Sequence, residues 1–295
     1  MKFSLSLVLG FLVTSAVLAE EIKVNVEELT FTTGTYSDLE ILSVHELSSH
    51  DERFGGLSGL LLKDETLISV SDKGKLFQFD LNELSKAQVF PLRTKKGKAY
   101  KGKRQSDAES IAHGSDGSLY VAFERDHRVV PFNATGVALG KKLKLPKGVS
   151  KLKKNSGFEA IETLPDGTLV LLGEGKGEAP LWIKPKKGKW QKRTLALSGG
   201  FRPTGLTYVA GRDNLIMMER FYMPLVGVRI RLSWLDVKTG LRGGEIAELT
   251  SPLPIDNMEG ITSYQNAQAE DILLLISDDN FSPLQRTLLM KARLK

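Results

Sequence analysis

The chain has 295 residues, 41% of them hydrophobic, a length that fits one large all-β domain as well as two smaller ones. It contains no cysteine, which excludes disulfide bonds, thiol nucleophiles and thiolate metal sites. The formal net charge is +6, with lysines and arginines gathered in a few short stretches.

The N-terminus has the pattern of a secretory signal peptide. Lys2 is followed by an apolar run over about residues 3–18, then by Ala19 and two glutamates. Residues 1–19 are therefore predicted to be a signal peptide cleaved after Ala19, and the mature protein to be periplasmic or secreted. An uncleaved anchor helix is the alternative. No later apolar stretch reaches about 18 residues, so we expect no stable membrane insertion after cleavage.

An internal repeat organises the rest of the chain. Residues 20–39 form a poorly patterned N-terminal segment, and residues 40–295 are expected to form a single domain. Five segments can be laid over one another, each with a short apolar strand, a polar turn and a longer apolar strand. They are residues 57–72, 108–124, 158–174, 203–219 and 258–278. Asp116-Gly117 and Asp166-Gly167 stand in two of the turns, where a hairpin needs residues that tolerate positive φ.

Further strand-like runs follow each of these hairpins. A third run is found at 75–81, 128–133, 180–184, 228–237 and 286–294, and a fourth at 88–93, 141–145, 190–197 and 245–250. A four-stranded unit that recurs at about 45 to 55 residues is typical of propeller blades. The sequence therefore predicts an all-β propeller.

The fifth repeat ends after its third strand. Residues 40–47, which precede the first repeat, could supply the missing outer strand and close the ring from the N-terminal side. Five blades are clear, and a sixth could lie in residues 22–39, so both five and six blades stay open.

Acidic residues recur at equivalent places in the repeats. The first strand opens with Ser58, Glu109, Glu159, Thr204 and Glu259, and the second ends with Asp72, Glu124, Glu174, Glu219 and Asp278. Because the two strands are antiparallel neighbours, the start of one and the end of the other lie at the same edge of the sheet. The pattern predicts eight carboxylates around one mouth of a central channel.

Carboxylates gathered at a mouth repel one another unless cations or hydrogen-bond donors compensate them. Oxygen ligands at this density suit Ca²⁺, and another divalent cation such as Mg²⁺ or Mn²⁺ is the alternative. The same acids could instead only cap strand ends and pair with nearby basic residues.

Basic residues are expected near the same mouth. Arg53, Arg125, Arg202 and Arg220 flank the strand ends and could bind substrate oxygens or simply neutralise the acids. Lysine-rich stretches at 93–104, 141–154 and 184–193 could attract anionic partners or be solvated loops. Aromatic residues are not interleaved with these lysines, so no nucleic-acid partner is expected.

Several repeat units resemble the phytase-like family described as "esterase-like activity of phytase". The resemblance rests on GFEAIETLPDGTLVLLGEG, DAESIAHGSDGSLYVAFER, RPTGLTYV, DNMEGITSY and LLLISDDNF, and it covers about residues 38–294. It implies an exported bacterial propeller that hydrolyses esters, including phosphate esters. By similarity to propeller phytases, it also implies calcium bound at the mouth by the acids named above, with the departures Ser58 and Thr204 making the site asymmetric.

The leading hypothesis is an exported, monomeric, metal-dependent hydrolase of a small anionic ester, in which Glu109, Glu159 and Glu174 are the catalytic candidates. The absence of a serine, cysteine or histidine nucleophile arrangement favours water activated by a metal. One alternative is a non-catalytic binding or scaffolding propeller with a structural cation, since a propeller does not by itself imply catalysis. Another is a six-bladed lactonase-like hydrolase with a single central calcium.

Overall fold

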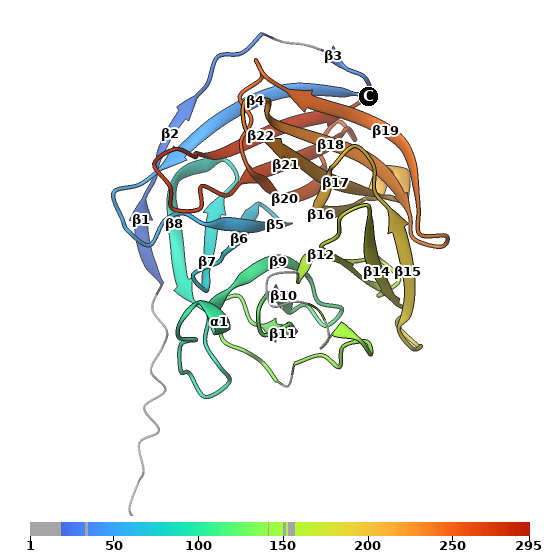
Figure 1. Ribbon diagram of the computed structural model, residues 1–295. Coiled ribbons are helices and arrows are strands. Elements are labelled where there is room, and N and C mark those ends of the chain that lie inside the picture. Colours follow the sequence, from blue (N-terminus) through green and yellow to red (C-terminus); the bar gives the residue numbers. More distant parts are fainter. Residues whose placement is uncertain (1–18, 33–34, 141, 150–151, 153–156) are drawn as a thin grey trace, which may run out of the picture.

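The structure is a computed structural model that describes residues 19–32, 35–140, 142–149, 152 and 157–295. The predicted signal peptide lies outside the described residues except for Ala19. Five antiparallel sheets stand around a common centre, as Figure 1 shows, and they form a five-bladed β-propeller. The prediction of an all-β propeller is confirmed, and the number of blades is five.

Blades one and five contain the strands nearest the two ends of the described chain. In blade one, β5 (Leu57–Lys63), β6 (Thr66–Ser71), β7 (Lys75–Asp80) and β8 (Glu83–Pro91) run outwards in order, and β1 (Glu20–Lys23) adds a fifth strand at the outer edge. Blade five consists of β20 (Met258–Gln265), β21 (Asp271–Ser277), β22 (Thr287–Leu294), β4 (Leu39–Ser48) and β2 (Asn25–Glu28), with the short β3 (Thr35–Tyr36) paired to β4. The strand predicted at 40–47 therefore closes the ring, because β4 pairs with β22 from the other end of the chain.

Blades three and four have the predicted four strands. Blade three contains β12 (Phe158–Thr163), β13 (Leu169–Gly173), β14 (Glu178–Lys184) and β15 (Gln191–Ala196). Blade four contains β16 (Arg202–Val209), β17 (Asn214–Met223), β18 (Gly227–Asp236) and β19 (Leu241–Thr250), and a turn of 3₁₀ helix, η2 (Ala210–Arg212), joins its first two strands.

In its described residues blade two has three regular strands, β9 (Ala108–His113), β10 (Leu119–Phe123) and β11 (Arg128–Phe132), preceded by the short α1 (Lys103–Ser106). The fourth strand predicted at 141–145 is wrong for its described residues, 142–145, which form no strand. The backbone N–H groups of Leu139 and Leu143 donate to the carbonyls of Pro131 and Val129. Proline has no N–H to return the bond, so Pro131 interrupts the ladder that a regular fourth strand needs.

The hydrophobic core lies between neighbouring blades. Between blades one and two, for example, Val70 and Leu76 pack with Ile111, Val121 and Phe123 in one buried cluster. The five innermost strands contact one another in sequence, and β20 contacts β5 to complete the circle. Within the described residues, no helix is long and apolar enough to cross a membrane.

Two hairpin turns opposite the mouth contain the Asp-Gly pairs that the sequence places there, and their backbone has the expected positive φ. Gly117 and Gly167 both adopt φ of +81°. The carboxylates of Asp116 and Asp166 accept the backbone N–H of Ser118 and Thr168 at 3.1 and 2.7 Å. These Asp-Gly turns fix the register between the first and second strands of their blades.

Candidate functional site at the mouth of the propeller

The innermost strand of every blade has a β-bulge at the mouth. The ladder between the first and second strands shifts register at one residue of the inner strand in each blade. The bulged residues are Ser58, Glu109, Glu159, Thr204 and Glu259. A bulge releases a residue from the ladder and redirects its side chain, so the structure gives these five positions the same local geometry.

The second strand supplies a matching position in four blades. The backbone N–H groups of Asp72, Glu124, Glu174 and Asp278 donate across to the carbonyls of residues 56, 107, 157 and 257 at 2.9 to 3.2 Å. This repeated hydrogen bond places four carboxylates directly beyond the ends of their strands, beside the bulges.

Blade four differs, and the prediction for Glu219 is corrected. Leu57, Ala108, Phe158 and Met258 pair with Ser71, Phe123, Gly173 and Ser277, each one residue before the ring acid. The corresponding Pro203 pairs with Glu219 itself, so the residue at the ring position is Arg220. The turn containing η2 makes the first hairpin of this blade longer than those of blades two and three, and a shift of one residue moves a side chain to the other face of the sheet.

Glu219 has a structural role away from the ring. Its side chain is fully buried, and its carboxylate accepts from Arg231 at 3.0 and 3.1 Å and from Arg242 at 2.5 Å. Two guanidinium groups thus compensate one buried carboxylate, which leaves Glu219 unsuited to bind a cation at the mouth.

Asp107 takes the place of Glu219 in the acidic set, and sequence reasoning missed it. Carboxylate oxygens of Asp107, Glu109 and Glu124 lie within 4.8 Å of one another, a geometry that could hold a metal ion. Asp107 is two residues before the bulged Glu109, and alternate residues of a strand share a face. This spacing of two residues could have identified Asp107 from the sequence. Asn257 occupies the same position in blade five, where its Nδ2 donates to Glu259 at 2.8 Å.

We define the mouth ring as a set of eight acids and four basic residues. The acids are Asp72, Asp107, Glu109, Glu124, Glu159, Glu174, Glu259 and Asp278, and the bases are Lys103, Arg125, Arg202 and Arg220.

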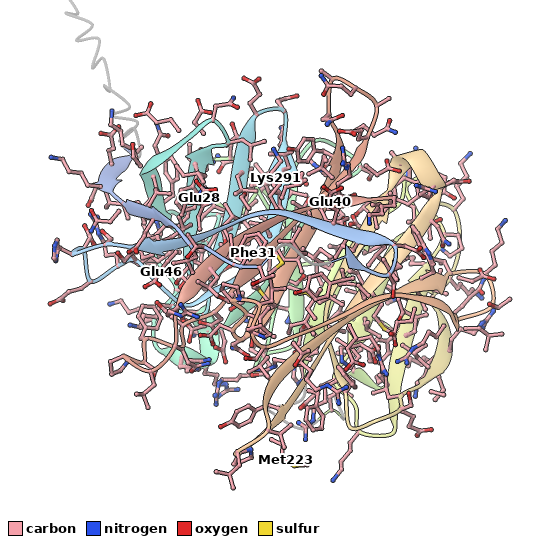
Figure 2. The ribbon with its side chains drawn as sticks, turned by 90° about the horizontal axis from the view of Figure 1, so that it is seen from above. Glu28, Phe31, Glu40, Glu46, Met223 and Lys291 are labelled. Carbon is pink, nitrogen blue, oxygen red and sulfur yellow. The ribbon has the colours of Figure 1, made fainter. Side chains whose placement is uncertain are left out.

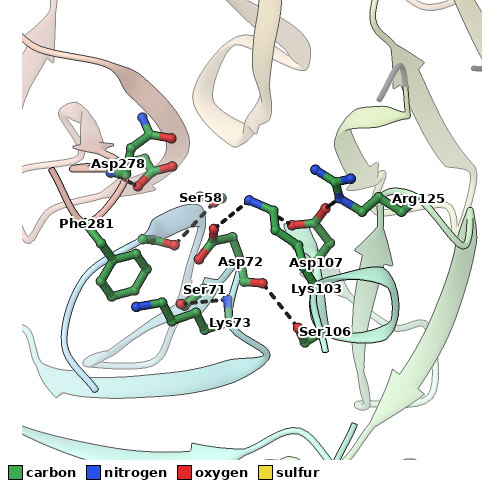
Figure 3. Close-up of polar contacts among 12 residues, drawn as sticks. Ser58, Ser71, Asp72, Lys73, Lys103, Ser106, Asp107, Arg125, Asp278 and Phe281 are labelled. Carbon is green, nitrogen blue, oxygen red and sulfur yellow. Dashed lines mark hydrogen bonds and ion pairs between the residues drawn. The ribbon is translucent and has the colours of Figure 1, made fainter. Parts of the chain in front are cut away.

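A chain of ion pairs links blades one and two within this ring. Lys103 of α1 donates to Asp72 at 3.1 Å and lies 3.7 Å from Asp107, and Arg125 donates to Asp107 at 2.5 Å (Figure 3). Lys103 was also missed from the sequence, because it comes from the connection between blades rather than from the repeat itself.

The remaining arginines occupy different surroundings. Arg202 donates to Glu174 at 2.7 Å, and a guanidinium nitrogen of Arg220 lies 4.0 Å from the carboxylate of Glu259. Arg53 is not brought to the ring. It pairs with Asp51 at 2.6 Å and with Glu20 of β1, so the expectation that Arg53 binds substrate is not supported by its position.

Burial and mutual repulsion raise the pKa of six acids of the ring, namely Asp72, Glu109, Glu124, Glu159, Glu259 and Asp278. Burial raises the pKa of Glu109 well above its usual range, and Glu259, Asp107 and Glu159 add to the effect. Burial likewise raises the pKa of Glu159 well above its usual range, with contributions from Glu259 and Glu174, while Arg220 lowers it. Burial, with the charge of Glu259, raises the pKa of Asp278 to about 8. A bound cation would favour the ionised form of these acids and so oppose the rise in their pKa.

Several buried oxygens of the site lack a hydrogen-bond donor among the described residues. They are Oδ1 of Asp72, Oδ1 of Asp107, Oγ1 of Thr204 and Oδ1 of Asn257. A buried acceptor without a donor is costly, and oxygens of this kind are what a hard cation such as Ca²⁺ takes as ligands. The donor set therefore fits a divalent cation, with Asp107, Glu109 and Glu124 as its nearest carboxylates.

Comparison with solved structures gives the same fold. A gluconolactonase from Xanthomonas campestris superposes with a TM-score of 0.51, at 12% identity over 96% of this chain and 99% of that one. A glutaminyl cyclase from Myxococcus xanthus superposes with a TM-score of 0.50, at 12% identity over 87% of this chain and 97% of that one. At this identity the likeness shows the fold alone.

Comparison of the amino-acid sequence with known proteins identifies the family of this chain. No curated protein matches the chain. The model of the phytase-like family, described as "esterase-like activity of phytase", matches residues 52–281. That span contains all five bulges and every acid of the mouth ring, and the chain belongs to the phytase-like family.

Proposed function

We propose that the protein is a metal-dependent hydrolase of small anionic esters, including phosphate esters, and that the mouth ring is its active site. The observation that carries the proposal is the excess of buried and half-buried carboxylates in the ring, eight acids against four basic side chains, with buried acceptor oxygens left without donors among the described residues. Such an arrangement is costly to folding unless it serves a bound cation.

The residues at the ring divide into three roles. Asp107, Glu109 and Glu124 would hold the cation, for which Ca²⁺ is the best match because all three ligands are carboxylates. Bound there, the cation would neutralise charge on the ester oxygens and lower the pKa of a water molecule.

Glu159 is the best candidate for proton transfer. It lies outside the three-carboxylate cluster, and burial raises its pKa well above its usual range, which suits a group that gives and takes a proton. Glu174 is less suited because Arg202 holds its carboxylate. Arg220 and Arg202 are placed to bind substrate oxygens, since each faces the ring from blade four and keeps partial exposure.

The family match and the fold support an enzyme of this kind without fixing the reaction. The proposal keeps the sequence expectation that the mature protein is exported and monomeric, with a small anionic ester as its partner.

The test is hydrolysis of a panel of carboxylic and phosphate esters with added Ca²⁺ or Mn²⁺ and with chelator. We expect turnover that needs the cation and falls at least 100-fold in Glu159→Gln, with the melting temperature kept. Glu83→Gln, on the exposed outer strand β8, is the matched control and should keep full activity. Background rates for the whole panel with either cation would refute the proposal.

A non-catalytic propeller with a structural cation is the second candidate, and the same orphaned oxygens are compatible with it. It predicts that Ca²⁺ raises the melting temperature while no ester is hydrolysed. In that case Glu159→Gln and Glu174→Gln would alter stability alone.

A further inference from the structure

Lys73 is a basic residue at the mouth that has no acid partner. It follows the ring acid Asp72 directly in the sequence, and its side chain is exposed. Lys103 and Arg125 are each held by ring carboxylates, whereas Lys73 forms no ion pair among the described residues. Its ammonium nitrogen lies instead 3.0 Å from the centroid of the Phe281 ring (Figure 3). The mouth thus contains a positive charge that no carboxylate holds in place.

Phe281 reaches Lys73 from the neighbouring blade. It belongs to the connection between β21 and β22 in blade five. In this connection, Oδ1 of Asp279 accepts the backbone N–H of Gly56 in blade one at 2.8 Å and that of Phe281 at 3.0 Å. One carboxylate therefore ties the loop of blade five to the segment that enters β5, and it sets the position of the Phe281 ring beside Lys73 and Asp72.

The backbone on both sides of this contact has an uncommon conformation. Gly56 has φ of +65°, and a Cβ atom there would overlap the Phe281 ring and lie 2.5 Å from Oδ1 of Asp72. The aromatic ring and the Asp72 carboxylate therefore meet over one glycine. Phe281 itself has φ of +50°, which bulky residues rarely adopt. Strain of this kind persists where the surroundings enforce it, and it is concentrated at ligand sites.

The charge of Lys73 acts on the acids of the mouth ring. Burial raises the pKa of Asp72, while the hydrogen bond from Lys103 and the charge of Lys73 lower it. Lys103 also bridges Asp72 to Asp107, at 3.1 and 3.7 Å, and Asp107 is one of the three clustered carboxylates of blade two. Lys73 is therefore linked to the three-carboxylate cluster through Asp72 and Lys103.

We propose that Lys73, held on the ring of Phe281, binds an anionic oxygen of the substrate and makes the mouth select charged esters over neutral ones. An ammonium group has three N–H donors, and a contact with an aromatic face leaves donors on its other side for a ligand. The acids of the ring repel an anion, so a cation that no carboxylate occupies is the group an anionic ester can use. The inference rests on the proposed function for the reaction, but not for the binding of the anion.

Binding of phenylphosphonate, an anion that has no ester bond to hydrolyse, tests this role without turnover. Calorimetric titration of the full chain with Ca²⁺ present should give an affinity that falls about tenfold in Lys73→Gln and stays within about threefold in Lys73→Arg, which keeps the charge and stacks on an aromatic ring. Lys63→Gln is the matched control and should bind like the wild type. Lys63 is exposed in the same blade, at the end of β5 farthest from the mouth, whose face is marked by Met223 in Figure 2. No binding by the wild type, or equal affinities of the two glutamine variants, would overturn the proposal.

Phe281→Leu tests the support of the ammonium group. It should weaken phenylphosphonate binding less than Lys73→Gln does, because the charge stays and only its position is lost. In the double variant the two losses should not add, since both act through the same ammonium group. Additive losses would show that Phe281 and Lys73 act separately, against the proposal.

Kinetics separate this role from a structural one and from the proposed function. Lys73→Gln should raise KM for 4-nitrophenyl phosphate, leave KM for the neutral 4-nitrophenyl acetate unchanged, and keep kcat for both esters. Equal changes of both KM values would indicate a structural role and contradict the proposal. Binding of phenylphosphonate that depends on Lys73, without hydrolysis of any ester, would refute the proposed hydrolase while supporting Lys73 as an anion site.

Discussion

Arg220 occupies, in blade four, the position that a carboxylate holds in the other four blades, and its neighbour Glu219 is turned into the protein. The two residues exchange roles because one extra residue in the turn before β17 changes which side chain faces the ring. Arg220 lowers the pKa of both Glu159 and Glu259, so this single exchange limits the repulsion within the ring. The ring is therefore asymmetric, with three clustered carboxylates in blade two and an arginine in blade four.

Neutralising Glu219 and neutralising Glu109 should have different effects on the stability of the protein. Glu219→Gln leaves Arg231 and Arg242 buried beside a neutral group, so we expect the free energy of unfolding to fall by about 3 to 5 kcal/mol. Glu109→Gln removes a charge from a repulsive cluster and should cost little or even stabilise the metal-free protein. Urea unfolding in the presence of chelator measures both. Equal losses for the two variants would show that Glu109 is structural as well.

The inner strands of all five blades share one sequence feature directly after the bulge. The residue after each bulge is small in all five blades, namely Gly59, Ser110, Ala160, Gly205 and Gly260. The structure gives the reason at Gly260, where a Cβ atom would lie 2.9 and 3.0 Å from the Cβ and the backbone nitrogen of Leu60 in the next blade. The inner strands of blades five and one leave no room for a side chain at this point.

Below the bulges, side chains bridge the inner strands. Ser110 accepts the backbone N–H of Ile161, and Glu162 accepts that of Tyr208, at 3.1 Å in both cases. Burial raises the pKa of Glu162 to about 7, which is a cost of using a carboxylate for this purpose. These bonds satisfy strand edges that have no neighbour in their own sheet.

Gly260→Ala tests the close approach of the inner strands. The added methyl group meets Ile276 at 2.7 Å as well as the backbone of blade one, so we expect a loss of about 1 to 3 kcal/mol. Gly244→Ala in β19 is the control, since nothing lies within 4 Å of the added atom and the change should stay within about 0.5 kcal/mol. Thermal or urea unfolding of both variants measures the two changes in stability. A neutral Gly260→Ala would mean that the strands can separate at this point without cost.

The fold was predictable because its signals are local and repeated. Apolar alternation, Asp-Gly turns and a regular period identify strands and blades, and the strand at 40–47 was recognisable because one blade lacked its outer strand. The irregular fourth segment of blade two was not predictable in this way, because Pro131 in the neighbouring strand interrupts its ladder of hydrogen bonds.

The site was predictable only in part, for a related reason. Seven of the eight proposed acids lie in the ring because strand spacing places them there, but Glu219 fails through a one-residue difference in a turn. Lys103 and the pairing of Arg53 with Glu20 depend on connections between blades, which repeat alignment does not describe.

At the scale of the whole molecule, closure of the ring brings acids from blades one, two, three and five to a single mouth. The strand β4 pairs with β22 over the length of blade five, so the circle is held by both ends of the chain. Within the mouth eight acids stand against four basic side chains, whereas the whole chain has a formal net charge of +6. A cation in the ring would reduce this contrast and let an anionic ester approach.

Calorimetric titration of the mature protein with Ca²⁺ tests the central claim, that the mouth ring is a cation site, most directly. We predict one-to-one binding that tightens as pH rises, because cation binding must displace protons from acids whose pKa is raised, and the measured heat should vary with the ionisation enthalpy of the buffer. Binding should weaken at least tenfold in Glu109→Gln and stay unchanged in Glu83→Gln. Absence of binding at any pH, or equal affinity in both variants, would contradict the claim.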